Sequence, residues 1–138
     1  MPPNMEEFIL SNNMIQGTLP TPLENLDEMR RFDMGSNMLS GTLPDFSIAY
    51  PNLQELDLSD QKRGNNSGLS GSIARLSNLP FVNSLNLAGN DLAGQIPAAL
   101  GNLGQFKRLI LSDNEFSNTI PSELGELSGD LRFFVHGS

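Results

Sequence analysis

The sequence predicts a solenoid of stacked repeats, in which each coil packs only against its neighbours. Segments that begin at Phe8 and Phe32 align without a gap, as do segments that begin at Leu85 and Leu109, and both offsets are 24 residues (32 − 8 and 109 − 85). Each copy places apolar residues at the same positions, in a segment too short to bury them alone. Neighbouring copies must therefore stack to form one continuous core.

Five copies and the start of a sixth occupy almost the whole of residues 1–138, which we interpret as a single array. The third copy runs from Leu53 to Leu58, is interrupted over residues 60–68, and resumes at Leu69. The interruption is rich in Gly, Asn, Ser and basic residues, which continue neither a strand nor an apolar column. We therefore expect a loop insertion near residues 60–68 that projects from the solenoid and is mobile.

Two apolar columns spaced by two residues indicate a strand with one buried face. The first column contains Phe8, Phe32, Leu56, Leu85, Leu109 and Phe134, and the second contains Leu10, Met34, Leu58, Leu87 and Leu111, with His136 at its end. Three further columns complete each coil: Ile15, Leu39, Leu69, Leu92 and Phe116; Leu19, Leu43, Ile73, Ile96 and Ile120; and Leu26, Tyr50, Leu79, Leu103 and Leu127.

These residues resemble the plant-specific class of leucine-rich repeats, whose consensus is LxxLxLxxNxLxGxIPxxLGxL, and the resemblance covers nearly the whole chain. It implies an α/β repeat solenoid: a right-handed horseshoe with a parallel concave β-sheet and a convex side of short helical turns. Known members are mainly ectodomains of receptor kinases and secreted inhibitors such as polygalacturonase-inhibiting proteins. The resemblance therefore implies protein or peptide partners and an extracellular or membrane-ectodomain location.

Several repeated residues are explained by the backbone alone. Asn13, Asn37, Asn90 and Asn114 follow the predicted strands, where an amide side chain can satisfy buried backbone groups. Gly17, Gly41, Gly71 and Gly94 stand at a corner where a side chain would crowd the next coil, with Asn118 at this position in the fifth copy. We assign these residues no binding role.

Composition excludes several classes of function. Sixteen acidic and eight basic side chains give a net charge of −8, which disfavours binding to nucleic acid. The sequence has no cysteine and one histidine, so it offers neither a thiolate nucleophile nor a histidine-based metal site. No apolar run reaches the roughly 18 residues that a membrane span requires. We therefore expect no enzymatic activity, no cofactor, no metal and no membrane insertion.

The outward strand positions are the best candidates for binding, because they can vary without disturbing the core. They form two columns: Glu7, Arg31, Glu55, Ser84, Arg108 and Phe133, and Ile9, Asp33, Asp57, Asn86, Ile110 and Val135. With strands about 4.8 Å apart, Glu7, Arg31 and Glu55 are within pairing reach, and Asp33 and Asp57 lie side by side as like charges. We predict that a partner, favoured to be basic, contacts Arg31, Asp33, Glu55, Asp57, Asn86 and Arg108.

An alternative function uses a different face. A polar residue precedes each Leu or Ile of the GxIP motif, and regular hydroxyls at coil spacing could match a repeating surface such as ice or a polysaccharide. The row contains Thr18, Thr42, Ser72, Gln95 and Thr119. The triplet Asn65-Asn66-Ser67 is an acceptor pattern for N-glycosylation in a secreted protein.

The two ends show none of the polar caps that stacked repeats need. Met1-Pro2-Pro3-Asn4 carries no secretory signal, and the paired cysteines usual in extracellular members are absent. We therefore expect a segment of a longer array, or a subunit whose ends are covered by neighbouring subunits.

Overall fold

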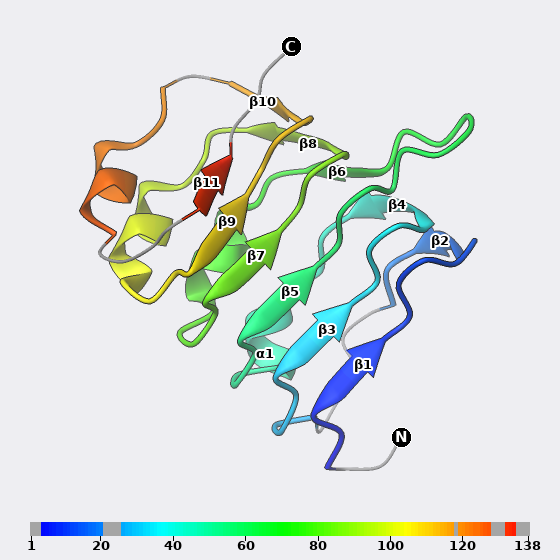
Figure 1. Ribbon diagram of the computed structural model, residues 1–138, viewed down its shortest axis with the longest axis horizontal. Helices are drawn as coiled ribbons and strands as arrows, with labels where there is room; N and C mark the ends of the chain where they lie inside the picture. The colour runs from blue at the N-terminus through cyan, green and yellow to red at the C-terminus, as the bar shows by residue number, and fades with distance from the viewer. Residues whose placement is uncertain (1–3, 21–25, 118, 128–131, 135–138) are drawn as a thin grey trace.

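A computed structural model describes residues 4–20, 26–117, 119–127 and 132–134, and it shows a solenoid (Figure 1). Each coil contributes one strand to a parallel sheet with the order β1-β3-β5-β7-β9-β11, so strands that follow one another along the solenoid are neighbours in the sheet. These strands are β1 (Glu7–Ile9), β3 (Arg31–Asp33), β5 (Glu55–Asp57), β7 (Ser84–Asn86), β9 (Arg108–Ile110) and β11 (Arg132–Phe134). We call the outward side of this sheet the concave face.

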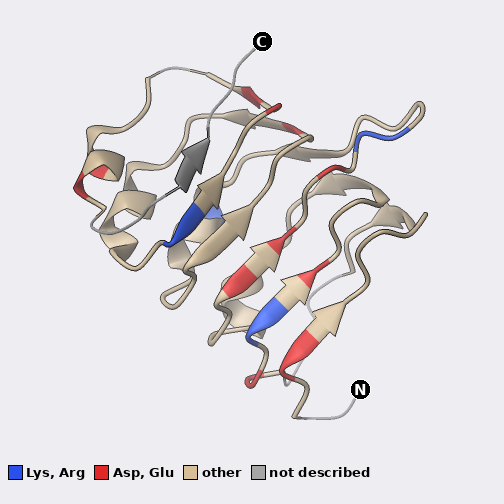
Figure 2. Ribbon diagram, in the orientation of Figure 1, with Lys and Arg blue, Asp and Glu red and all other residues tan. Residues whose placement is uncertain are grey.

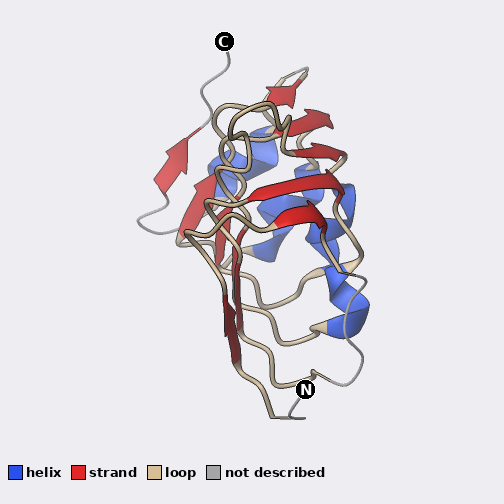
Figure 3. Cartoon of the chain, turned by 90° about the vertical axis from the view of Figure 1, so that its right-hand side faces the viewer, coloured by secondary structure: helices blue, strands red, loops and turns tan. Residues whose placement is uncertain are grey.

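A second parallel sheet and a row of short helices complete the coils (Figure 3). The second sheet contains β2 (Gln16–Thr18), β4 (Met38–Thr42), β6 (Leu69–Gly71), β8 (Asp91–Gly94) and β10 (Glu115–Phe116). The helices lie on the side opposite the first sheet: α1 (Phe46–Ala49) and the 3₁₀ helices η1 (Ala74–Asn78), η2 (Ala98–Leu103) and η3 (Ser122–Glu126). The predicted two-sided α/β solenoid is confirmed.

The core contains most of the predicted apolar columns together with buried residues that we did not assign to a column, among them Met29, Leu53, Val82 and Phe106, each three residues before a member of the first column. From Phe32 to Leu109 the first column is at most 3% exposed, and its residues are direct partners in the sheet register. Among the described column residues, Leu10 is 38% exposed and Ile120 is 55% exposed, and five more are only partly buried: Phe8, Ile15, Leu43, Leu103 and Phe116. One aromatic cluster extends the core, because Phe32 packs against the rings of Phe8, Phe46 and Tyr50 at centroid distances of 5.2 to 5.8 Å.

The predicted register of the sixth copy is wrong by one residue. Phe133, rather than Phe134, pairs with Leu109, and Arg132, rather than Phe133, pairs with Arg108. The offset of 24 residues thus continues from Leu109 to Phe133 (133 − 109), whereas our alignment had assumed one extra residue. Our placements of Asn118, Val135 and His136 fall outside the described residues.

A ladder of amide side chains links successive coils. The Oδ1 atom of Asn37 accepts a hydrogen bond from the Ile15 N–H at 3.0 Å, and its Nδ2 donates to the Leu10 carbonyl at 2.9 Å. Each amide thereby completes the backbone hydrogen bonding of the preceding coil, as the structural interpretation of these asparagines requires. The same contacts join Asn90 to Leu69 and Leu58, and Asn114 to Leu92 and Leu87.

Gln61 is the ladder residue of the third coil, which corrects the predicted extent of the insertion. It is fully buried, its Oε1 accepts from the Leu39 N–H at 3.0 Å, and its Nε2 donates to the Met34 carbonyl at 2.9 Å. Gln61 also stands 24 residues after Asn37 (61 − 37). In the five coils whose ladder residue is described, the residue before it is left-handed, with φ between 54° and 68°: Asn12, Ser36, Asp60, Gly89 and Asp113.

The exposed part of the insertion is therefore shorter than residues 60–68. Residues 62–65 are exposed, whereas Gly68 is buried. The ends of the loop are held to the body, because the Lys62 Nζ lies 2.6 Å from the Asp91 Oδ1 and the Asn66 Nδ2 donates to the Leu39 carbonyl at 2.9 Å. The loop does project from the coils, at the right of Figure 1.

Candidate functional site on the concave face

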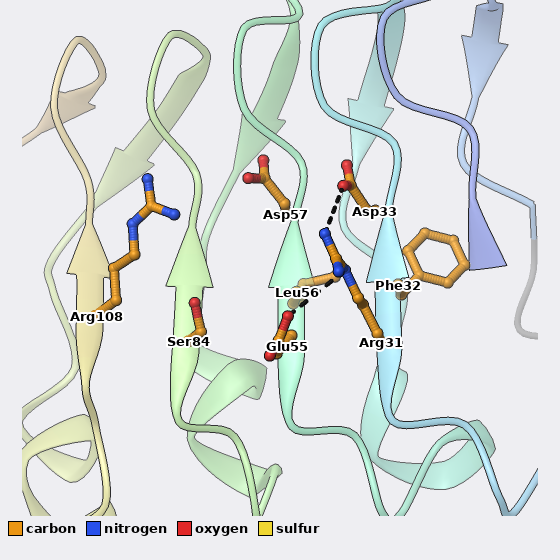
Figure 4. Close-up of a pocket in the computed structure, with 8 residues that line it drawn as sticks. All are labelled: Arg31, Phe32, Asp33, Glu55, Leu56, Asp57, Ser84 and Arg108. Carbon is orange, nitrogen blue, oxygen red and sulfur yellow. Dashed lines mark hydrogen bonds and ion pairs between the residues drawn. The ribbon is translucent and has the colours of Figure 1, made fainter. Parts of the chain in front are cut away.

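A shallow hollow of about 60 Å³ lies on the concave face across four consecutive strands (Figure 4). Parallel strands with matched register place equivalent outward residues in rows, so side chains from four coils reach one surface. The hollow is lined by Arg31, Phe32 and Asp33 of β3, Glu55, Leu56 and Asp57 of β5, Ser84 of β7 and Arg108 of β9.

Arg31 carries the charge pairing at one side of the hollow. Its Nη2 lies 3.5 Å from the Asp33 Oδ2, and its Nε lies 3.5 Å from the Glu55 Oε2. The side chains of Arg31 and Glu55 are 42% and 52% exposed, so water screens the pair and its contribution to stability is small. Glu7 is the register partner of Arg31, but the ion pairs of Arg31 within the described residues are with Asp33 and Glu55.

Asp57 accepts three hydrogen bonds from within the fold. Its Oδ1 accepts from the Ser59 N–H at 3.0 Å and the Ser59 hydroxyl at 2.6 Å, and its Oδ2 accepts from the Asn86 Nδ2 at 2.9 Å. A Cβ at Gly35 would lie 2.9 Å from the Asp57 Oδ1, so glycine at position 35 makes room for this carboxylate. Asp57 therefore shapes the turn after β5 as well as the hollow.

Asp33 repeats this arrangement one coil earlier, because its Oδ1 accepts from the Gly35 N–H at 3.1 Å. The register places Asp33 directly beside Asp57, which confirms the predicted like-charge neighbours. Asn86 extends the series, since its Oδ1 accepts from the Ala88 N–H at 3.4 Å. All three side chains serve the turn at the end of a strand, a role that the sequence prediction missed.

Arg108 differs from Arg31, because none of the described carboxylates lies within 4 Å of its guanidinium. It extends from β9 beside Ser84, on the opposite side of the hollow from Arg31 (Figure 4). Along this row of outward residues, β3 carries the cation Arg31, β5 the anion Glu55, β7 the uncharged Ser84 and β9 the cation Arg108 (Figure 2). Two arginines and three carboxylates line the hollow, a net charge of −1 (2 − 3).

The structure brings five of the six predicted contact residues into the hollow. The sixth, Asn86, is joined to it through the hydrogen bond to Asp57. Ser84 also lines the hollow, although we did not select it from the sequence. Its place in the outward column of Glu55 and Arg108 was the signal that could have identified it.

All five residues of the predicted polar row are exposed: Thr18 and Thr42 in β2 and β4, and Ser72, Gln95 and Thr119 after the ends of β6, β8 and β10. Two of its members also pack between coils. A Cβ at Gly41 would lie 3.0 Å from the Thr18 Cγ2, and a Cβ at Gly71 would lie 3.2 Å from the Thr42 Cγ2. The glycines therefore accept the threonine methyl groups of the preceding coil, which gives both residue types a structural purpose.

Within the described part of the chain, no three His, Asp or Glu side chains form a group that could hold a metal ion. The helices described there are all too short to cross a bilayer.

Comparison with known proteins identifies the repeats. The family model described as Leucine Rich Repeat matches residues 4–26, 81–103 and 105–127, which is half of the chain (69 of 138 residues). None of the curated protein sequences matches significantly.

Solved structures with the same fold include plant receptor proteins. The Arabidopsis receptor kinase HAESA in complex with the peptide hormone IDA and the co-receptor SERK1 matches with a TM-score of 0.81 and 34% identity, over 96% of this chain and 22% of that one. The BIR3–SERK2 complex from Arabidopsis thaliana matches with a TM-score of 0.71 and 35% identity, over 88% and 64%. Pollen Receptor Kinase 3 matches with a TM-score of 0.79 and 29% identity, over 96% and 61%. The chain thus spans less than two thirds of each of these structures.

Proposed function

Because the chain belongs to the leucine-rich repeat family, we propose that it is a non-catalytic recognition module that binds a protein or peptide on its concave face. The observation that carries this proposal is the convergence of Arg31, Asp33, Glu55, Asp57 and Arg108 on one hollow across four strands. Asn86 supports the hollow from its edge. The similar structures include one with a peptide hormone and a co-receptor, which favours this class of partner and an extracellular location.

The contacts of the hollow refine the expected chemistry of the partner. Asp33 and Asp57 accept hydrogen bonds from backbone N–H groups. Glu55 pairs only with the exposed Arg31 among the described residues and is itself 52% exposed, so it is the carboxylate of the hollow most accessible to a basic group of a partner. Arg108 offers a guanidinium that none of the described carboxylates neutralises. A partner that presents a Lys or Arg to Glu55 and a hydrogen-bond acceptor to Arg108 would match both groups.

The test begins with peptides selected from a displayed random library on the wild-type chain. We expect Glu55→Gln and Arg108→Gln each to weaken binding of a selected peptide about fivefold or more, a loss on the order of 1 kcal/mol. Matched controls remove the same charges elsewhere: Glu115→Gln on β10 and Arg75→Gln in η1, and both should bind as wild type does. Binding should also weaken as salt is added.

The polar row of Thr18, Thr42, Ser72, Gln95 and Thr119 is the alternative binding surface, and the same experiment tests it. If the selected peptides bind the Glu55 and Arg108 variants unchanged, while Thr18→Ala with Thr42→Ala abolishes binding, the concave-face proposal is lost. The surface-adsorbing function would then take its place, and adsorption to ice or to polysaccharide would be measured directly on the same variants.

A further inference from the structure

We propose that Asn65 is an N-glycosylation site, an assignment that rests on the extracellular location proposed above. Asn65-Asn66-Ser67 is the single N-x-Ser/Thr triplet in the 138-residue sequence. Such triplets are common by chance, so the assignment depends on where the fold places this one.

The insertion presents Asn65 at its tip. Residues 62–65 are exposed, and Ser67 is exposed as well. Gly64 has a φ of 62°, and a Cβ built there would meet nothing within 4 Å, so the space around the tip is open. In Figure 1 the loop extends beyond the second sheet, away from the strands that line the hollow. A glycan at the tip would therefore leave the concave face accessible.

The two asparagines of the triplet have different roles. The Asn66 Nδ2 donates to the carbonyls of Leu39 and Gln61, each at 2.9 Å, and the Asn66 N–H donates to the Arg63 carbonyl at 3.1 Å. Asn66 thereby closes the loop on the body of the solenoid. The side-chain amide of Asn65 has no hydrogen-bond partner among the described residues, so the fold does not need it.

The modification would be a group transfer from a lipid-linked oligosaccharide pyrophosphate, catalysed by the transferase of the secretory pathway. The Asn65 Nδ2 forms a bond to C1 of the first sugar as the bond between C1 and the pyrophosphate oxygen breaks. The lipid pyrophosphate leaves with that electron pair, and the Nδ2 gives up one proton to a base of the transferase. The product is an uncharged N-glycosidic amide on an exposed loop.

The experiment secretes the chain from eukaryotic cells behind a heterologous signal, beside a known glycoprotein that reports active glycosylation. Intact mass is measured before and after treatment with peptide N-glycosidase. Wild type and Asn66→Gln, which keeps the acceptor triplet, should carry a glycan that the enzyme removes. Asn65→Gln and Ser67→Ala should be secreted without one.

Stability separates the two asparagines further. Asn66→Gln should lower the thermal midpoint, because the anchoring hydrogen bonds are displaced, whereas Asn65→Gln should leave it unchanged. Secreted wild type that lacks a glycan beside a glycosylated reporter would overturn the proposal, and so would a glycan that persists in Asn65→Gln. The peptide-binding test uses unglycosylated chain from bacteria, so its failure and failure of this proposal are distinguishable.

Discussion

The buried amide of Gln61 provides the sharpest test of the third coil. Replacement by methionine, which is also unbranched and similar in length, removes the amide with little change in volume. Three of the groups that contact Gln61 keep another partner: the Met34 carbonyl still accepts from Asn37, the Leu58 carbonyl from Asn90, and the Ser59 carbonyl from Ser36. The Leu39 N–H alone loses its acceptor.

The expected cost follows from that one orphaned donor. A buried polar group left without a partner costs about 1–3 kcal/mol, and Gln61 is 0% exposed, so water cannot replace it. We expect Gln61→Met to lower the free energy of unfolding by about that amount in urea denaturation. Amide hydrogen exchange at Leu39 should accelerate, because its N–H is no longer protected by the side chain.

The matched control is Arg63→Met, two residues further along and fully on the exposed part of the loop. A surface change of this kind should alter the free energy of unfolding by less than about 0.5 kcal/mol. If Gln61→Met costs no more than Arg63→Met, and exchange at Leu39 is unchanged, Gln61 is not a ladder residue. Residues 60–68 would then form the free loop that the sequence first suggested.

Three further predictions concern the core, the turns and the loop. Leu87→Ala should cost about 2–5 kcal/mol in urea denaturation because it opens a cavity between coils, and a loss below about 0.5 kcal/mol would show that the column is misplaced. Gly89→Ala should lower the thermal midpoint, since φ is +68° and the new Cβ would lie 2.7 Å from the Asp60 Oδ1; an unchanged midpoint would refute this strain. Subtilisin should cut first within residues 62–65, and a first cut between Leu85 and Pro97 would contradict the assigned coil boundaries.

The apolar columns were predictable because burial acts on each coil in the same way. Leu56, Leu85 and Leu109 occupy equivalent positions in successive coils, so the repeated apolar pattern identifies the strand and its buried face, even where the insertion lengthens the third coil. The outward positions follow from the same register, which is why five of the six chosen residues line one hollow. The buried columns and the outward strand positions, which are set by the repeat spacing, could therefore be predicted from the sequence.

The residues that were missed depend on side-chain chemistry at single positions. Gln61 was assigned to the loop because the other coils use asparagine, although its amide offers the same donor and acceptor on a longer chain. Asp33 and Asp57 were interpreted as free charges, but a short carboxylate also reaches the N–H two residues onward. Periodicity does not reveal whether such a side chain points to a partner or to its own backbone.

The direction of the amide ladder makes the two ends of any stack of these coils unequal. The Leu69 N–H is completed by Asn90 and the Leu92 N–H by Asn114, in each case by the following coil. A break between two coils would leave orphaned donors on the N-terminal piece, whereas the ladder amides of the C-terminal piece could turn to water. We therefore expect a coil that lacks its C-terminal neighbour to fray more readily than a coil that lacks its N-terminal neighbour. Adding a coil at the C-terminal end of a stack should stabilise the coil before it.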